Sequence, residues 1–477
     1  MRLASATCPV LFKRSSPLHR ISSTFSHMEV QRRLPTPPRA VFTDFGRALQ
    51  ESTLRETTEM LEDLAKKDDR REIVFKSIRS ILQNNANILF LIRTGTPTEV
   101  LQPMIEENVG ILTSVLPSDP EDREGRLSFA CTMFVEIRLL RYFFSHGCLA
   151  VKERVQPCTD EEYLQGALGF AHELVRYALG QASEGNTESI ELCKKLLIEL
   201  NTKMMEFDFR NGPLRRKYDG LKYALKKVEE ITYELSLLDS LNDDPALKRM
   251  RLDSSQEALN EAPLVDCDDM DAIRSRYEEV DKTREEVIKQ SRDVQKQAKQ
   301  AIFSVHRGNL DDAKNKCQAC MQVITEIMPK IEKFPELRYG SFSNSLEEYG
   351  EAMLTLSWVE SKRIMQKAEL VVCNRDEYVG ALADFTGEIG RIAVNKASQR
   401  DVVAVREIMQ ADLVLYNFLM KLNIGGKYQK KVDETYNNLK KVEDILYDLS
   451  LLNFGGRSGK REGRVEESKE SGKDNEN

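Results

Sequence analysis

The chain consists of long windows in which apolar residues recur every three or four positions, separated by short stretches that hold most of the Gly and Pro residues. In one such window Leu221, Leu225, Val228 and Leu235 are separated by lysines and glutamates. This spacing places the apolar side chains on one face of a helix. Valines and isoleucines do not alternate with polar residues as they do in strands. The pattern therefore predicts an all-α protein.

The helical pattern occurs twice. The segment LKKVEEITYELSLL at 225–238 matches LKKVEDILYDLSLL at 439–452, with eleven of fourteen positions identical at a separation of 214 residues. Two further pairs of segments match at nearly the same separation: 163–176 with 378–391, and 78–95 with 291–308. So long a period indicates a duplicated domain and not a short structural repeat. We expect two tandem helical bundles of about seven helices each.

Composition divides the chain into five regions. Residues 241–269 are acidic, interrupted by Pro and poor in aromatic residues, which is typical of a linker. The end of the chain is rich in Gly, Ser and mixed charge without apolar periodicity, so we expect it to be disordered. The regions are a leader at 1–40, a first copy at 41–240, a linker at 241–269, a second copy at 270–454 and a tail at 455–477.

The leader and the linker contain candidate targeting signals. Residues 1–28 are basic and rich in serine, and the first acidic residue is Glu29, which is typical of a transit peptide for a mitochondrion or plastid. A disordered leader, or sequence that precedes a start at Met28, explains the composition equally well. The basic run LKRMRL at 247–252 matches a nuclear localisation signal, although runs this short arise often by chance.

The overall composition limits the function. With 41% hydrophobic and 31% charged residues and no apolar run long enough to span a bilayer, we expect no membrane partner. The formal charge of −7 argues against a generally basic nucleic-acid-binding surface, but it allows a local basic lining. The nine cysteines are scattered and odd in number, as expected of free thiols in a reducing compartment.

One acidic stretch is a candidate for chemistry. SLEEYGEAML at 345–354 carries three carboxylates and no lysine or arginine. Glu348 and Glu351 are three positions apart and share a face of the predicted helix. Like charges at this spacing repel by about 0.2–0.5 kcal/mol, so the cluster is either a solvated face or a site for a cation. The stretch alone leaves both interpretations open.

Longer segments resemble a known family. The stretch LRRKYDGLKYALKKVEEITYELSLL at 214–238 resembles the last helix of translin proteins. The second copy resembles the TRAX branch of the same family through SRDVQKQAKQAIFSVHR, LEEYGEA and LADFTGEIGR. The resemblance covers 41–240 and 270–454, and therefore predicts a translin-like first copy and a TRAX-like second copy.

The resemblance implies a fold and an activity. Members of the family are helical bundles that assemble into closed shells and bind single-stranded and double-stranded RNA and DNA inside. The translin–TRAX complex is a Mg²⁺-dependent endoribonuclease whose chemistry resides in TRAX. It removes passenger strands in RNA silencing and trims precursor tRNA fragments. For this chain the expected ligands are thus single-stranded or small RNA, with single-stranded DNA as a further candidate.

The resemblance also implies a metal site in the second copy. Glu348 and Glu351 match the two glutamates of the TRAX helix, and Asp384 matches its third acid, with Glu388 following one turn later. We expect the first three to be catalytic ligands of Mg²⁺, or of Mn²⁺ as an alternative, and Glu388 to be either a fourth ligand or an acid that orients the ligands. Two helices with paired carboxylates suit a hard cation that prefers oxygen.

The first copy departs from this pattern. The equivalent positions hold Met133, Glu136, Gly169 and Glu173, so two of the four acids are missing. We therefore expect the first copy to lack a metal site. It also lacks the His/Arg-rich segment that precedes the central helix in many translins, since this region reads DREGRLSFACTMF without histidine.

Basic residues on the repeated helices are candidates for binding phosphate groups. Each phosphate that they neutralise releases counterions, so binding should weaken steeply with salt. Lysines that only keep long helices soluble are the alternative. The candidates are Arg138, Arg141, Arg215, Arg216, Lys217, Lys222, Lys427, Lys430 and Lys431.

These inferences predict a metal-dependent endoribonuclease that forms a homo-oligomer or assembles with separate translin chains. From the resemblance we expect it in the cytoplasm and nucleus, with a mitochondrion or plastid as the alternative. A catalytically silent nucleic-acid-binding or scaffold protein is the competing hypothesis. A helical adaptor without nucleic acid is a third hypothesis, which only the acidic net charge favours. The RNA substrate and the oligomer size do not follow from the sequence.

Overall fold

The computed structural model describes residues 43–116, 125–241, 262–422 and 427–454. The leader at 1–40, the basic run at 247–252 and the tail at 455–477 lie outside the described residues. Most of the predicted linker lies outside them as well. No helix among the described residues has the length and apolar character needed to cross a membrane.

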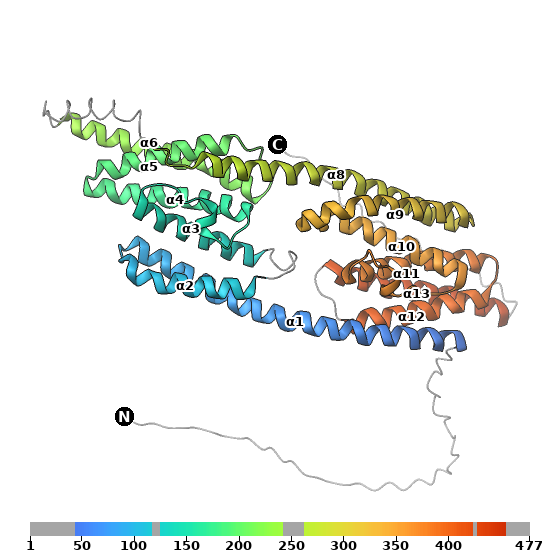
Figure 1. Ribbon diagram of the computed structural model, residues 1–477. Helices are drawn as coiled ribbons and strands as arrows, with labels where there is room; N and C mark the ends of the chain where they lie inside the picture. The colour runs from blue at the N-terminus through green and yellow to red at the C-terminus, as the bar shows by residue number, and fades with distance from the viewer. Residues whose placement is uncertain (1–42, 117–124, 242–261, 423–426, 455–477) are drawn as a thin grey trace, which may run out of the picture. The chain divides into compact units, whose positions relative to one another are not determined.

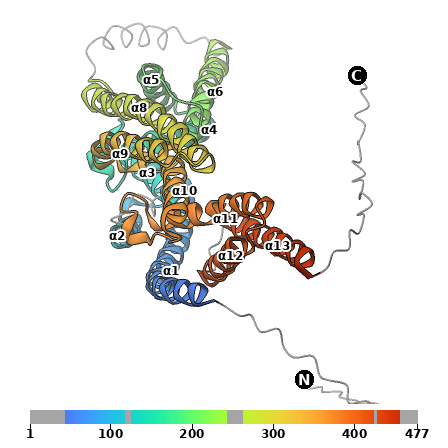
Figure 2. The same ribbon diagram turned by 90° about the vertical axis from the view of Figure 1, so that its right-hand side faces the viewer.

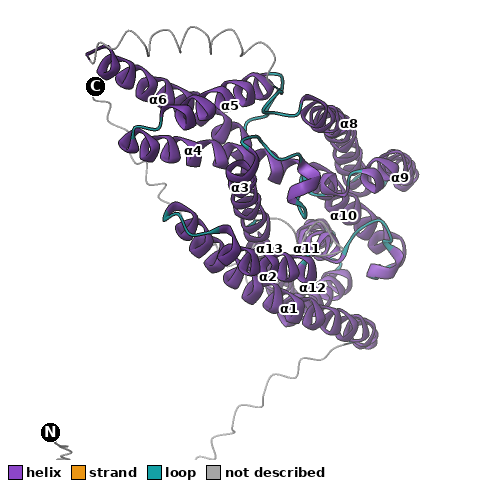
Figure 3. Cartoon of the chain, turned by 60° about the vertical axis from the view of Figure 1, so that its left-hand side comes forward, coloured by secondary structure: helices purple, strands orange, loops and turns teal. Residues whose placement is uncertain are grey.

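The prediction of an all-α protein with two tandem bundles is confirmed. Every regular element in the described part of the chain is a helix, and no strand occurs there (Figure 3). The first copy contains α1 (Asp44–Arg93), α2 (Thr98–Val115), α3 (Arg126–His146), α4 (Asp160–Glu184), α5 (Thr187–Met205) and α6 (Pro213–Leu241). The second contains α8 (Cys267–His306), α9 (Leu310–Lys333), α10 (Ser341–Ser361), α11 (Arg375–Ser398), α12 (Val402–Leu422) and α13 (Lys427–Phe454) (Figure 1). Short 3₁₀ helices, η2 (Lys152–Val155) and η5 (Lys367–Glu369), lie before α4 and α11.

The two copies begin corresponding helices in the same way. At the start of α4 the Thr159 hydroxyl accepts the Glu162 N–H, and the Glu162 carboxylate accepts the Thr159 N–H. Asn374 and Glu377 form the same reciprocal pair at the start of α11, 215 positions later. Such a pair satisfies backbone donors that the first helical turn leaves free. The local signals for helix initiation are therefore duplicated along with the hydrophobic pattern.

The hydrophobic core of the first copy includes the start of α8. Val265, Met270 and Ile273 are buried in one cluster with side chains of α3 to α6, such as Phe134 and Phe170. The side chain of Asp269 in α8 also binds the backbone of the first copy, because its Oδ2 accepts a hydrogen bond from the Lys152 N–H at 2.8 Å. The first turns of α8 thus belong to the core of the preceding copy.

The second copy uses the first half of α1 in the same way. Helix α1 packs against α12, and the ring of Phe45 lies 6.0 Å from that of the buried Trp358 (Figure 2). Glu56 of α1 accepts the Lys367 N–H at 2.6 Å and the Tyr378 hydroxyl at 3.1 Å. Glu56 and Asp269 thus occupy equivalent places, 213 positions apart. Each copy is completed by the first helix of the other.

Candidate active site

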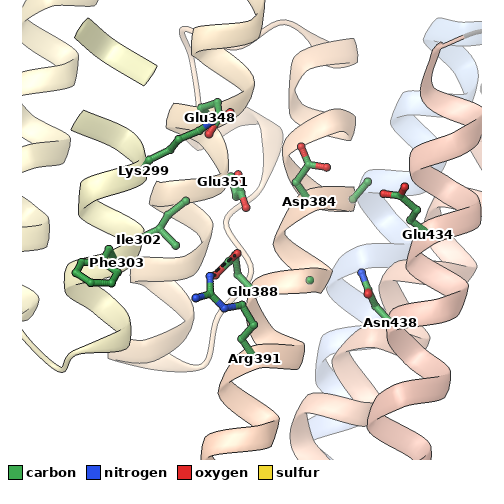
Figure 4. A pocket seen from close by; sticks show the side chains of 12 residues that line it. Lys299, Ile302, Phe303, Glu348, Glu351, Asp384, Glu388, Arg391, Glu434 and Asn438 are labelled. Carbon is green, nitrogen blue, oxygen red and sulfur yellow. Dashed lines mark hydrogen bonds and ion pairs between the residues drawn. The ribbon is translucent and has the colours of Figure 1, made fainter. Parts of the chain in front are cut away.

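A cavity of about 480 Å³ lies in the second copy between α8, α10, α11 and α13. Figure 4 shows its lining, with acidic side chains from α10 and α11 directed into the same space. The structure brings the four predicted acids to this one cavity: Glu348, Glu351, Asp384 and Glu388. Lys299, Phe303, Arg391, Glu434 and Asn438 also line it.

A close approach of α10 and α11 makes this arrangement possible. A Cβ atom added at Gly350 would lie 2.9 Å from the Cβ of Ala381, closer than real Cβ atoms approach. Because Gly350 has no side chain, the two helices pack closely directly beside Glu351 and Asp384. Glu348 and Glu351 share one face of α10, and Asp384 and Glu388 share one face of α11. The four carboxylates therefore face a common space.

Glu351 is the most perturbed acid of the cavity. Burial and the nearby carboxylates of Asp384, Glu348 and Glu388 raise its pKa to about 8, although Lys431 opposes the shift. The neutral form is favoured because charging a carboxylate in a buried acidic cluster is costly. Strongly perturbed acids of this kind cluster at functional sites.

Asp384 forms an ion pair with a lysine. The Lys431 ammonium lies 2.5 Å from Oδ2 of Asp384 and 2.9 Å from Oε2 of Glu347. Burial nevertheless raises the pKa of Asp384 above its usual value, against the effect of Lys431. Burial lowers the pKa of Lys431, but its two carboxylate partners outweigh this and raise it overall. The residue that the sequence suggested as a phosphate ligand thus lies within the acidic site.

The other two acids also have cationic partners. Lys299 lies 3.0 Å from Glu348, and the Glu388 carboxylate accepts from both His306 and Arg391. Burial raises the pKa of Glu388, but His306 and Arg391 lower it by more. Sequence reasoning missed Glu347, Lys299 and His306. The repeat contained a signal for His306, because the equivalent position in the first copy holds Arg93, which binds the equivalent acid Glu173.

The side chains that line the cavity suit a hard cation, because five of them are carboxylates, the four predicted acids and Glu434, and none contains sulfur. Among the described residues, however, no three His, Cys, Asp or Glu side chains are grouped closely enough to hold a metal ion as they stand. Glu348, Asp384 and Glu388 are paired with protein cations instead. A metal ion would have to replace at least Lys431 at the acids it binds.

In the equivalent site of the first copy, side chains lie close to two glycines. A Cβ at Gly169, the counterpart of Asp384, would overlap Oε2 of Glu136 and lie 3.0 Å from its Cδ. The His172 side chain lies against Gly220, because a Cβ atom added at Gly220 would be 3.2 Å from Nε2 of His172. Arg93 binds both carboxylate oxygens of Glu173, at 2.9 and 2.7 Å. The equivalent site of the first copy thus has Glu136, His172 and Arg93 where the second copy has Glu351, Gly387 and His306.

Glu136 retains an unusual environment. Burial and the neighbouring Glu173 raise its pKa to about 7, while Lys217, Arg93 and Arg176 oppose the shift. Lys217 is the counterpart of Lys431, since the last helices align at a separation of 214 residues. Each copy therefore places one lysine of its last helix against the buried acids.

The remaining basic candidates lie apart from the acidic cavity. Arg215 pairs with Asp219 at 3.3 Å, Lys222 lies over the ring of Tyr223, and Arg216 and Lys430 are exposed. Lys427 begins α13, but its side chain lies outside the described residues. Arg138 and Arg141 line a separate cavity at the end of α3.

Comparison with known proteins identifies the family of both copies. The Translin family model matches residues 69–238 and 282–453. Translin of Cricetulus griseus is 38% identical over 203 residues, which span 36% of this chain and 88% of that protein. The translin-associated protein X homolog of Schizosaccharomyces pombe is 24% identical over 187 residues, 35% of this chain and 81% of that protein.

Other matches are shorter or more distant. Those to chicken and human translin span 40% and 34% of those proteins. The crystal structure of apo-NeC3PO matches with a TM-score of 0.36 at 20% identity and covers 38% of this chain and 96% of that one. Because the family model matches both copies over most of their length, the chain is a tandem member of the Translin family.

Proposed function

We propose that this protein binds nucleic acid and that its second copy is a Mg²⁺-dependent endoribonuclease acting on single-stranded or small RNA. The observation that supports this most is the difference between the copies. The second copy has a cavity into which Glu348, Glu351, Asp384 and Glu388 all face, whereas in the first copy Met133 and Gly169 replace two of these acids and the Glu136 carboxylate lies against Gly169. A fully solvated acidic face would not hold Glu351 half-buried among other carboxylates.

Glu348, Glu351 and Asp384 are the proposed ligands of the ion, and Glu388 is a fourth ligand or orients the others. Mg²⁺ prefers oxygen ligands and retains several waters, and Mn²⁺ is an alternative. When bound, the ion would polarise the scissile phosphate and stabilise the leaving oxygen. Lys431 and Lys299 would then be released from Asp384 and Glu348, which makes both ammonium groups available to phosphate oxygens of the substrate.

The first copy would contribute RNA contacts and assembly surface. The exposed basic residues Arg216, Lys222 and Lys430 are candidates for phosphate contacts, so binding should weaken with salt. We propose homo-oligomers or assemblies with separate translin chains. The proposed location is the cytoplasm and nucleus, with an organelle as the alternative through residues 1–28. Passenger-strand removal and tRNA-fragment processing are the proposed settings.

The direct test is cleavage of a labelled single-stranded RNA by the full chain in Mg²⁺ and in EDTA. Glu348→Ala and Glu351→Ala should abolish metal-dependent cleavage while RNA binding persists. Glu136→Ala is the matched control, because this buried glutamate lies at the equivalent place in the copy that we expect to be silent. Cleavage that survives in both second-copy variants would exclude the proposed active site.

A catalytically silent RNA- or DNA-binding protein is the second candidate. It is favoured by the protein cations that already neutralise three of the four acids. Asp384→Ala separates the two functions. An enzyme loses cleavage and keeps RNA binding, whereas a binding protein cleaves in neither form.

A further inference from the structure

A second, smaller cavity of about 140 Å³ lies in the first copy, where the end of α3 meets η2. Its lining contains no Asp or Glu. Three arginines and two aromatic rings dominate it: Arg138, Arg141, Arg154, Tyr142 and His146. This combination differs from the acidic cavity of the second copy in both charge and size.

Two of the arginines, Arg138 and Arg154, are held in place by neutral groups. The Arg138 guanidinium donates to the carbonyl oxygens of Arg154, at 2.5 Å, and Gln156, at 3.3 Å. This contact fixes the turn that carries Arg154. The Arg154 guanidinium in turn lies over the ring of Tyr142, 5.6 Å from its centroid. Neither contact neutralises a positive charge.

The aromatic rings form a flat platform beside these charges. Tyr142 and His146 are one helical turn apart on α3, so their side chains lie on the same face. Their rings stack with centroids 4.0 Å apart and planes inclined by 8°. His146 is exposed at the outer side of the stack. Aromatic faces of this kind stack with bases, and stacking contributes about 1–3 kcal/mol per base.

The positive charges repel one another in the unliganded cavity. Burial and the charge of Arg141 lower the pKa of Arg138. A bound anion would relieve this repulsion. Compensation of the negative end of the α3 dipole is the alternative role for the arginines. That role requires only positive charge near the end of the helix. It does not explain why a cavity with two stacked aromatic rings lies beside the arginines.

The basic and aromatic residues of this pocket are not repeated in the second copy. The positions equivalent to Arg138, Arg141, Tyr142 and His146 in the second copy are Met353, Leu356, Ser357 and Ser361, 215 residues later. The basic and aromatic character is therefore not a requirement of the shared fold.

We propose that this pocket binds a terminal phosphate monoester of an RNA strand, with the adjoining base stacked on His146. The cavity accommodates a single phosphate or base and is too small for a continuous strand. A terminal monoester carries about −1.5 to −2 charge at pH 7, more than an internal diester, and so suits several guanidinium groups better. This inference rests on the proposed function, because it assigns recognition of the RNA end to the first copy.

The test compares RNA strands that differ only at their ends. Binding of one short single-stranded RNA with a 5′-phosphate, a 3′-phosphate or no terminal phosphate is measured by fluorescence anisotropy in EDTA, which prevents metal-dependent cleavage. We expect the full chain to bind one phosphorylated form about tenfold more tightly than the unphosphorylated RNA. Arg141→Met and Arg154→Met should abolish this preference, so that the phosphorylated and unphosphorylated strands bind each variant with equal affinity. Arg79→Met, at an exposed arginine of α1 outside the pocket, should leave the preference intact.

Each outcome separates this inference from the proposed function. Equal binding of all three strands, or a preference that survives in both pocket variants, would overturn the pocket assignment while leaving RNA binding intact. If no RNA binds, a nucleoside monophosphate is titrated in its place. Binding of that ligand, lost in Arg141→Met, would support the monoester pocket and overturn the RNA-binding function. Absence of both would overturn the inference.

Discussion

Lys431 lies 2.5 Å from Asp384 and neutralises one of the two acids that the second copy has and the first copy lacks. The same ammonium lies 2.9 Å from the buried Glu347. A lysine in this position allows two carboxylates to remain in a partly buried site without a metal ion, because removing a charge from water is tolerated only when it is paired. Lys431 is thus the internal counterion of the candidate active site.

Replacing this lysine should destabilise the protein. Lys431→Met leaves Glu347 and Asp384 without their shared cation, so we expect the free energy of unfolding to fall by about 1–3 kcal/mol. Chemical denaturation measures this loss. Lys430→Met, at an exposed neighbour, should have little effect. Mg²⁺ should raise the denaturation midpoint of Lys431→Met more than that of the wild type, because the ion can replace the missing charge. Equal stability of wild type and Lys431→Met without metal would contradict the role of Lys431.

Glu136 should make stability depend on pH. Its pKa is raised from 4.5 to about 7, so between these values the folded protein retains a proton that the unfolded chain has lost. This group therefore lowers stability progressively as pH rises through that window. Glu136→Gln should be close to wild type at pH 4.5 and more stable by about 1–3 kcal/mol above pH 7. Urea denaturation of both proteins across this range tests the prediction, and a constant difference would count against it.

The close approach of Glu136 to Gly169 predicts coupling between these two residues. Gly169→Ala should change stability by less than about 1 kcal/mol, because its methyl group displaces the flexible end of the Glu136 side chain and this cost offsets the helix-favouring effect of Ala. In a Glu136→Ala background the same change should be neutral or should stabilise α4 by up to about 1 kcal/mol, since Ala favours helices over Gly. A double-mutant cycle measured by thermal or urea denaturation gives the coupling. Additive effects would mean that Glu136 does not occupy this space in solution.

The reciprocal contacts of α1 and α8 predict matched effects in the two copies. Glu56→Ala removes the acceptor of the Lys367 N–H, and Asp269→Ala removes that of the Lys152 N–H. Each should cost about 1–3 kcal/mol because a buried donor loses its partner. Hydrogen exchange should accelerate in the first half of α1 in Glu56→Ala and at the start of α8 in Asp269→Ala.

Glu59→Ala changes an exposed acid of the same helix and serves as the control for Glu56→Ala. If hydrogen exchange in α1 is unchanged in Glu56→Ala, the first half of this helix does not depend on its contact with the second copy.

The sequence was sufficient to predict features that depend on local spacing. The periodicity of apolar residues gave the helices, and the repeat at about 214 residues gave the duplication. The three-residue spacing of Glu348 and Glu351, together with the four-residue spacing of Asp384 and Glu388, placed each pair on one helical face. Helical periodicity and these pair spacings lie within a few turns of a single helix, and the repeat follows from comparing the sequence with itself, so the order of residues determines all of them directly.

Only the tertiary structure decided how these faces meet. The pairing of Lys431 with Asp384 and of His306 with Glu388 joins residues 47 and 82 positions apart. The contact of Glu56 with Tyr378 spans 322 positions. Glu136 fills the place of a missing aspartate because two helices approach closely where Gly169 has no side chain. Such contacts depend on helix packing across the whole fold, and the spacing of residues along one helix does not specify them.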